Sequence, residues 1–248
     1  MGPTALPTGR PINVSTLLSG YVELSQPATT RDLRILGELT KSDTSKAALK
    51  DLADSYADKV LTRRLSVLDI LEEHVDINIT FAIFLRLLPS MRVRQYSISS
   101  SPLADATRAS LTISVLEAPA ISGRNEPFLG VASTYLSSLR PNDRVQLVVR
   151  PSNAAFHPPT DLTVPLVMFC AGSGLAPLRG FLQERATQKK AGREVAKSIL
   201  FMGCRKPTED YLYSDTDLKA WVDLGIVDVR PAFSRATDQS FGCKYVQE

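Results

Sequence analysis

The order of apolar and polar positions changes character twice along the chain. Over residues 27–89, apolar residues recur at spacings of three and four, which predicts a series of amphipathic helices. The helical segments are DLRILGEL, KAALKDLADSY, KVLTRRLSVLDILEEH and FAIFLRLL. Pro89 should end the last of them, because proline cannot continue a helix. Residues 1–20 contain Pro3, Pro7 and Pro11, and they are predicted to be extended or loop.

From residue 93 to about 151 the period becomes two, which is typical of strands. The predicted strands are 94–100, 110–117 and 144–150, with a short helix over 132–139. From residue 162 onward, apolar strands alternate with helices, and this alternation predicts a βαβαβ unit with a parallel sheet. Its strands are expected at 162–170, 198–204 and 226–233, and its helices at 178–190 and near 215–224.

Composition excludes several kinds of protein. The net charge is only +3 and Lys and Arg are mixed with Asp and Glu, so no basic stripe for nucleic acid is present. No apolar run approaches the roughly 20 residues of a membrane helix, and no signal peptide is recognisable. Cys170, Cys204 and Cys243 are odd in number and far apart, which indicates reduced thiols in a cytoplasmic protein. Two histidines are too few for a metal cluster, and no metal site is expected.

The segment Arg94-Gln95-Tyr96-Ser97-Ile98-Ser99-Ser100-Ser101-Pro102 gathers a cation, an aromatic ring and several hydroxyls. In a strand, Arg94 and Tyr96 share one face and Gln95 and Ser97 the other. A guanidinium and hydroxyls suit a phosphate, and an aromatic face suits a flat ring. Such residues also occur in ordinary half-buried strands, so this segment alone leaves both interpretations open.

A glycine-rich turn follows the apolar run 162–170 and precedes an amphipathic helix. Gly172-Ser173-Gly174 would let the backbone approach a ligand closely, and the helix N-terminus would face a phosphate. Pro177 stands where a dinucleotide motif has its third glycine, and proline is tolerated in the first turn of a helix. A glycine turn in any α/β unit is an equally good interpretation of this loop by itself.

Taken together, six segments resemble the diflavin reductases in content and order. They are RQYSISSSP (94–102), FLGVASTYL (128–136), CAGSGLAPLRGFLQER (170–185), FMGCRKPTEDYLY (201–213), AFSR (232–235) and KYVQ (244–247). That family includes NADPH–cytochrome P-450 reductase, the sulfite reductase flavoprotein and the reductase part of nitric oxide synthase. ISSSPLAD, GVASTYLSSL and GCKYVQ are most similar to the reductase half of self-sufficient monooxygenases, in which a haem hydroxylase and its reductase share one chain.

The resemblance implies an α/β fold of three parts: an antiparallel β-barrel FAD domain, a helical insert, and a C-terminal parallel-sheet NADP-binding domain of the ferredoxin-reductase type. Residues 1–26 would be an irregular lead-in and remnant of the FAD domain, and 27–91 the helical connecting region. Residues 92–160 would form an incomplete FAD-binding barrel and 161–248 a truncated NADP-binding domain. Compared with the family, the chain is expected to be a fragment truncated at both ends.

For FAD, the resemblance implies that Arg94 and Ser97 bind the pyrophosphate and the flavin edge, with Tyr96 stacked on the ring. Ser97 would also be the catalytic residue of the hydride-transfer site. The segment 130–133 begins a short helix whose N–H groups would take further phosphate charge. The remaining FAD contacts implied are Arg64, Gln95, Thr112, Ile113, Ser114, Gly130, Val131, Ala132 and Ser133.

For NADPH, Gly172, Ser173 and Gly174 would bind the pyrophosphate. An arginine offers a planar fork to a 2′-phosphate, and a tyrosine ring can flank adenine. The second strand ends in basic residues and lacks the acidic residue that would bond a free ribose 2′-hydroxyl. The residues implied in selecting NADPH are Arg205, Ser234, Arg235, Lys244, Tyr245 and Gln247.

The function implied is that of an NADPH–haemoprotein reductase. A hydride from NADPH would reach FAD, and electrons would then pass through an FMN domain to a haem monooxygenase of the fatty-acid hydroxylase type. FMN and haem would reside on parts of the full-length chain outside these 248 residues. An inactive fragment that only binds a nucleotide or a protein partner is the alternative interpretation.

Overall fold

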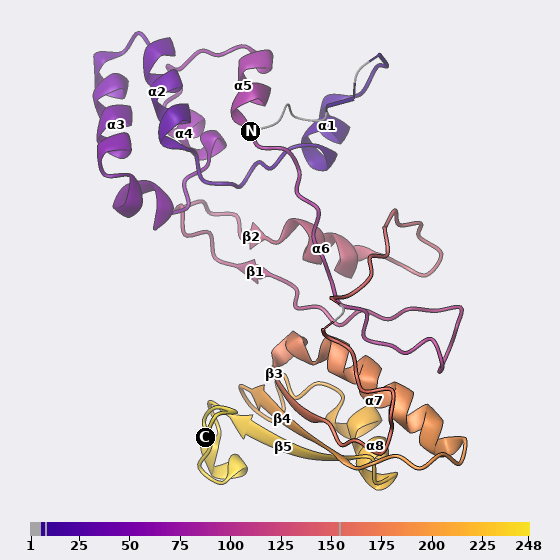
Figure 1. Ribbon diagram of the computed structural model, residues 1–248. Helices are drawn as coiled ribbons and strands as arrows, with labels where there is room; N and C mark the ends of the chain where they lie inside the picture. Colours follow the sequence, from indigo (N-terminus) through magenta and orange to yellow (C-terminus); the bar gives the residue numbers. More distant parts are fainter. Residues whose placement is uncertain (1–5, 8, 154) are drawn as a thin grey trace. The chain divides into compact units, whose positions relative to one another are not determined.

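The computed structural model describes residues 6–7, 9–153 and 155–248. The chain divides into two compact units. The first comprises Met1–Arg94 and Glu117–Leu129, and the second comprises Gln95–Leu116 and Gly130–Glu248. The chain therefore passes from one unit to the other after Arg94, after Leu116 and after Leu129 (Figure 1).

The first unit is mainly helical, as the apolar spacing predicts. Its helices are α1 (Val14–Gly20), α2 (Thr30–Leu39), α3 (Asp43–Asp54), the π-helical turn η1 (Ala57–Leu61), α4 (Val67–Glu73) and α5 (Phe81–Leu87). The α-helices begin at polar caps, because the side chains of Asn13, Thr29, Ser42, Ser66 and Thr80 accept backbone N–H bonds of the first turn. Their apolar sides form one core that includes Leu33, Leu36, Leu49, Leu65 and Ile70.

Two predictions in this unit are wrong. Helix α1 lies where loop was predicted, because the three prolines all precede Asn13, whose side chain caps the helix by accepting the N–H of Thr16 at 2.7 Å. The single helix predicted over 59–74 is two elements, η1 and α4. They are separated by Arg64 at a positive φ of 52°, and a new cap at Ser66, bonded to Asp69, starts α4.

A small antiparallel pair, β1 (Glu117–Ala118) and β2 (Phe128–Leu129), completes the first unit. Among the described residues of the whole chain, no helix has the length and apolar character needed to cross a bilayer.

The second unit contains the predicted parallel sheet, in the order β3-β4-β5 (Figure 1). The strands are β3 (Val167–Ala171), β4 (Ser198–Cys204) and β5 (Val227–Phe233), and the helices are α6 (Val131–Ser138), α7 (Leu175–Lys190) and α8 (Lys219–Asp223). Short helical turns are η2 (Gly172–Gly174), η3 (Ser214–Leu218) and η4 (Thr237–Ser240). Strand β3 starts later than predicted, because Pro165 cannot donate a ladder hydrogen bond.

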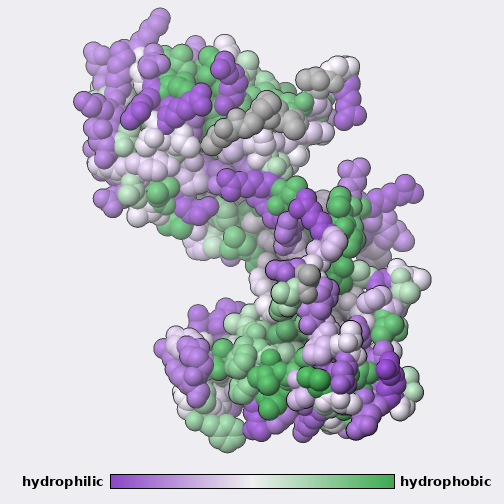
Figure 2. Space-filling view, viewed as in Figure 1, coloured by the Kyte–Doolittle hydropathy of each residue, from purple (hydrophilic) through white to green (hydrophobic). Residues whose placement is uncertain are grey.

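One face of the sheet packs on α7 and α8, and the other is open. Met168, Leu200 and Met202 are buried with Leu182 and Trp221 in one core. Alternate residues point the other way: Val167 is 61% exposed and Phe169 is 60% exposed, with the Phe169 ring stacked on that of Phe201. Apolar side chains accordingly reach the surface of this unit in Figure 2.

No closed barrel is present among the described residues, which corrects the predicted strands 94–100, 110–117 and 144–150. Only the bridge between Ile98 and Leu111, with the N–H of Ser99 donating to the Ser110 carbonyl at 2.7 Å, pairs the first two segments. Segment 144–150 is not a strand, and its Leu147 and Val148 are 71% and 80% exposed. Alternation is a property of the side chains, whereas a strand also needs a neighbouring backbone with which to pair.

Candidate functional site

The carboxyl end of β3 leads into the glycine-rich turn and then into α7. Gly172 has a φ of +50°, a conformation that strains other L-residues, and a Cβ built on it would meet nothing within 4 Å. The turn therefore presents open backbone to solvent. Helix α7 is 16 residues long and its N-terminal N–H groups lack partners within the helix, so its start favours an anion. Pro177 lies in its first turn, as predicted.

Backbone hydrogen bonds continue beyond the ends of β4 and β5 and align the residues that follow. The N–H of Ser234 donates to the Cys204 carbonyl at 2.9 Å, and the N–H of Arg235 donates to the Arg205 carbonyl at 2.9 Å. The Ser234 hydroxyl also donates to the Cys204 carbonyl, at 3.3 Å. The structure thus places Ser234 and Arg235 beside Arg205, at the same sheet edge as the glycine turn.

The two arginines at this edge have different electrostatic surroundings. Arg205 Nε lies 3.2 Å from an oxygen of Asp210 and 3.6 Å from one of Glu209. Burial alone would raise the pKa of Asp210, but hydrogen bonds from Arg205 and from the Lys206 N–H hold it below its ordinary value. Arg235 is exposed and forms no ion pair with any described residue. Its charge is therefore the better placed for an anionic ligand.

Sequence reasoning missed this acidic pair. No carboxylate stands directly at the end of the second strand, but Glu209 and Asp210 return to Arg205 after a turn. The signal in the sequence was the spacing of four and five residues from Arg205 to Glu209 and Asp210, which allows an ion pair across a turn.

The C-terminal segment passes close to the end of β4. A Cβ built on Gly203 would lie 3.3 Å from Cγ1 of Val246 and 3.4 Å from Cβ of Ala171, so little more than a glycine fits there. Lys244, Tyr245 and Gln247 flank Val246 and are exposed; Lys244 Nζ lies 5.3 Å from the Tyr245 ring centre. The predicted NADPH residues of the second unit therefore gather at one edge of its sheet.

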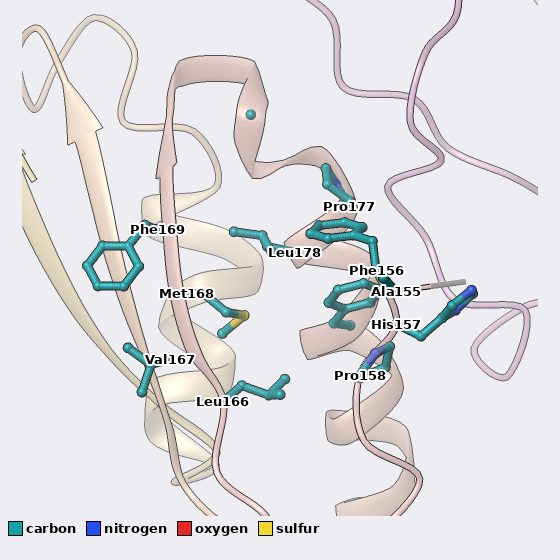
Figure 3. Close-up of a pocket in the computed structure, with 12 residues that line it drawn as sticks. Ala155, Phe156, His157, Pro158, Leu166, Val167, Met168, Phe169, Pro177 and Leu178 are labelled. Carbon is teal, nitrogen blue, oxygen red and sulfur yellow. The ribbon is translucent and has the colours of Figure 1, made fainter. Parts of the chain in front are cut away.

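An apolar recess of about 300 Å³ adjoins the glycine turn (Figure 3). It is lined by residues 155–158, residues 166–169, Gly174, Pro177, Leu178 and Phe181. The rings of Phe156 and Phe181 are 5.5 Å apart, and His157 is hydrogen-bonded to Ser152 at 3.0 Å. None of these lining residues carries a carboxylate, an ammonium or a guanidinium, so the recess suits an apolar or flat group.

The predicted flavin segment 95–116 lies against α7 within the second unit. Arg179 donates to the Ser99 carbonyl at 2.6 Å, and the Ser101 N–H donates to Gln183 Oε1 at 2.8 Å. Gly180 lies in this contact, where a Cβ would be 3.5 Å from the Ser100 carbonyl oxygen, an ordinary van der Waals distance.

Of the flavin residues predicted in this segment, Gln95, Tyr96, Ser97 and Ser114 are exposed, whereas Thr112 and Ile113 are half-buried. The Thr112 hydroxyl is 2.9 Å from that of Tyr213. An exposed ring at Tyr96 and an exposed hydroxyl at Ser97 can both meet a ligand.

The helix start at 130–133 has a packing role that sequence reasoning did not foresee. The buried Ser133 hydroxyl accepts the Leu116 N–H at 3.0 Å and donates to the Gly130 carbonyl at 3.2 Å. A Cβ on Gly130 would come within 2.8 Å of Leu116 Cβ, so glycine is required sterically. Because this hydroxyl is bonded within the protein, a ligand here would meet the backbone of Val131 and Ala132 rather than the Ser133 side chain.

Arg64 and Arg94 belong to the first unit. Arg64 is exposed, with its guanidinium carbon 5.7 Å from the Phe128 ring centre. Arg94 is paired with the buried carboxylate of Glu23, through Nη1 to Oε1 and through Nη2 to Oε2 at 3.0 Å. Its side chain keeps 30% exposure, so a ligand can still reach it.

Within the second unit, the donor set fits a phosphorylated dinucleotide: open glycine backbone at a helix start, and an exposed arginine at the same end of the sheet. The described residues contain no cluster of His, Cys, Asp and Glu suited to a metal.

Comparison with known proteins agrees with this chemistry. The model of the family described as "FAD binding domain" matches residues 4–135. Over 247 residues the chain is 68% identical to a self-sufficient cytochrome P-450 monooxygenase of Phanerodontia chrysosporium, covering 100% of this chain and 23% of that protein.

Two further relatives carry the name bifunctional cytochrome P-450/NADPH–P-450 reductase. That of Acremonium egyptiacum is 51% identical over 99% of this chain, and that of Fusarium oxysporum is 48% identical over 100% of it. The chain spans 23% of the length of each.

Proposed function

The chain belongs to the FAD binding domain family, and on this basis we propose that it is the FAD- and NADPH-binding part of a reductase that supplies electrons to a cytochrome P-450. The single observation that supports this most strongly is the alignment of Ser234 and Arg235 with Cys204 and Arg205, at the same end of the parallel sheet as the open turn at Gly172. The names of the relatives, matched along the whole chain, indicate the electron acceptor.

In this proposal each group of residues has one task. Arg94 and Arg64 bind FAD phosphate, Tyr96 stacks on the flavin, and Ser97 adjoins the reacting edge. Thr112, Ile113 and Ser114 line the flavin, and the N–H groups at 130–133 take phosphate charge. The Gly172–Gly174 turn binds the NADPH pyrophosphate.

Selection of NADPH is assigned to the exposed guanidinium of Arg235 and the hydroxyl of Ser234, with Arg205, Lys244, Tyr245 and Gln247 around them. Bound FAD supplies the capacity to accept a hydride and to release electrons singly. The protein residues contribute binding, ring orientation and exclusion of water.

The finer fold is also proposed. Residues 92–160 are assigned to an antiparallel FAD-binding barrel of the longer protein, residues 27–91 to its helical connecting region, and 161–248 to a ferredoxin-reductase-like NADP domain. An FMN domain and a haem monooxygenase domain of the same polypeptide are the proposed partners.

The test compares 2′,5′-ADP with 5′-AMP, which differ by the 2′-phosphate. Arg235→Ala should weaken 2′,5′-ADP binding by about tenfold to a hundredfold, because a charge-assisted phosphate contact of about 1.5–3 kcal/mol is lost. Binding of 5′-AMP should not change, and calorimetry measures both. Arg193→Ala is the matched control, since Arg193 is an exposed arginine in the loop after α7.

If Arg235→Ala weakens the binding of 2′,5′-ADP and 5′-AMP equally, or changes neither, the proposed selection of NADPH is wrong. If the nucleotides bind as expected but a longer chain with both flavin domains is not reduced by NADPH, a purely nucleotide-binding module becomes the better assignment.

A further inference from the structure

Glu23 is a buried charged residue that the proposed ligand contacts do not use. Only 3% of its surface is exposed. It lies where residues 21–23 run beside residues 89–92: Val22 bridges Ser90, the Glu23 N–H donates to the Pro89 carbonyl at 2.9 Å, and the Met91 N–H donates to the Tyr21 carbonyl at 2.8 Å. This short pairing fixes the backbone at Glu23 and, opposite it, the chain up to Arg92, two residues before Arg94.

The Glu23 carboxylate is fully engaged. Oε1 accepts the N–H of Arg92 at 2.9 Å and a bond from Arg94 Nη1, and Oε2 accepts Arg94 Nη2 at 3.0 Å. Burial alone would raise the pKa of Glu23, but these hydrogen bonds and the two arginine charges lower it below the ordinary value. The carboxylate is therefore ionised at neutral pH.

A buried ion pair is an uncommon way to gain stability, because apolar residues of similar volume are often as stable or more so. Its distinctive property is geometric. The guanidinium is planar, and two parallel N–H···O bonds fix that plane. The Nη1 group of Arg94 donates in addition to the Arg92 carbonyl at 2.6 Å, which restrains it further.

We propose that Glu23 is a positioning residue, which orients the Arg94 guanidinium for the pyrophosphate of FAD. The inference rests on the proposed function, because it takes Arg94 as a phosphate ligand. Glu23 itself does not touch the cofactor: a carboxylate next to a phosphate would repel it, and both oxygens of Glu23 already accept bonds from protein donors. It acts only through the orientation of Arg94.

The experiment compares FAD with riboflavin, which has the same ring system and no phosphate. Glu23→Gln should weaken FAD binding by about tenfold while leaving riboflavin affinity unchanged, as measured by flavin fluorescence titration. Glu38→Gln in α2, at an exposed position of the same unit, is the matched control and should change neither affinity. If Glu23 served only folding, Glu23→Gln would weaken the binding of FAD and of riboflavin together, and that result would overturn the inference.

Two further variants keep the inference testable. Glu23→Asp retains the charge and shortens the side chain, so it should also weaken FAD binding several-fold and leave riboflavin binding unchanged. This variant serves as the test if circular dichroism shows that Glu23→Gln folds poorly. Adding Glu23→Gln to Arg94→Ala should cause no further loss of FAD affinity, whereas a full additional loss would show that Glu23 acts independently of Arg94.

A different result would contradict the proposed function rather than the role of Glu23. If Arg94→Ala binds FAD as tightly as Arg108→Ala, a variant at an arginine whose side chain is 86% exposed, then Arg94 is not the phosphate ligand. If Arg94→Ala weakens FAD binding and Glu23→Gln does not, only the positioning role of Glu23 is wrong.

Discussion

At the scale of single residues, what a side chain contacts decides its chemistry more than its type does. Arg205 and Arg235 follow adjacent strands, yet Arg205 lies against two carboxylates and Arg235 forms no ion pair with the described residues. The cysteines differ in the same way: Cys170 and Cys204 are buried in the core of the sheet, and Cys243 is half-buried.

These surroundings predict the order in which the thiols react. Burial raises the pKa of Cys170 to about 11, and burial with the charges of Asp210 and Cys170 raises that of Cys204 to about 12. Because the thiolate is the nucleophile, each is expected to react at pH 8 about a hundredfold more slowly than an ordinary thiol, or slower still. Peptide mapping after brief treatment with iodoacetamide should find Cys243 labelled first. Early labelling of Cys204 would show that its side of the core is open, and full labelling of all three in denaturant is the control.

At the scale of elements, local signals predicted more than non-local ones. Strand β4 was predicted at its observed bounds, because its apolar run lies between turn residues, and α5 ends before Pro89 as expected. The start of α4 at Ser66 depends on a single cap that the apolar spacing conceals. The predicted strands 94–100 and 144–150 failed because pairing depends on a second backbone, which an alternating pattern does not specify.

The same limit applies to the candidate site. The glycine turn and AFSR segment were found from short motifs, and the structure brings them to one sheet edge. The pairing of Glu23 with Arg94 joins residues 71 positions apart, and nothing in either local sequence signals it.

Arg179 makes part of the contact between segment 95–116 and α7, alongside Gln183. Besides the Ser99 carbonyl, Arg179 bonds Asp217 through Nε at 2.8 Å and lies over the Tyr213 ring at 4.4 Å. Arg179→Met should lower the stability of the second unit by about 2–3 kcal/mol, because hydrogen bonds of a charged donor are lost. Hydrogen exchange should also accelerate at the amide of Ser99. Arg193→Met, which removes only an exposed bond to Gln188, should change neither measurement. Unchanged exchange in Arg179→Met would show that Gly180 and Gln183 suffice for this contact.

At the scale of the whole molecule, the two units have separate apolar cores, and the predicted NADPH residues all belong to the second. Leu36 and Leu200 are fully buried, one in each core. A leucine-to-alanine change in a core costs about 2–5 kcal/mol, and units with their own cores can unfold in separate steps.

Calorimetric unfolding of two variants therefore tests the organisation and the site together. Leu36→Ala should lower the unfolding temperature of one transition and Leu200→Ala that of the other. A ligand at a hundred times its dissociation constant stabilises the state it binds by about 2.7 kcal/mol, which raises the unfolding temperature of a small domain by several degrees. Because the residues proposed to bind NADPH all lie in the second unit, 2′,5′-ADP should raise the temperature of only the transition that Leu200→Ala lowers, and 5′-AMP at the same concentration should raise it less. A ligand shift confined to the transition that Leu36→Ala lowers would place the nucleotide site in the helical unit, and a single transition lowered by both substitutions would show that the two cores unfold as one.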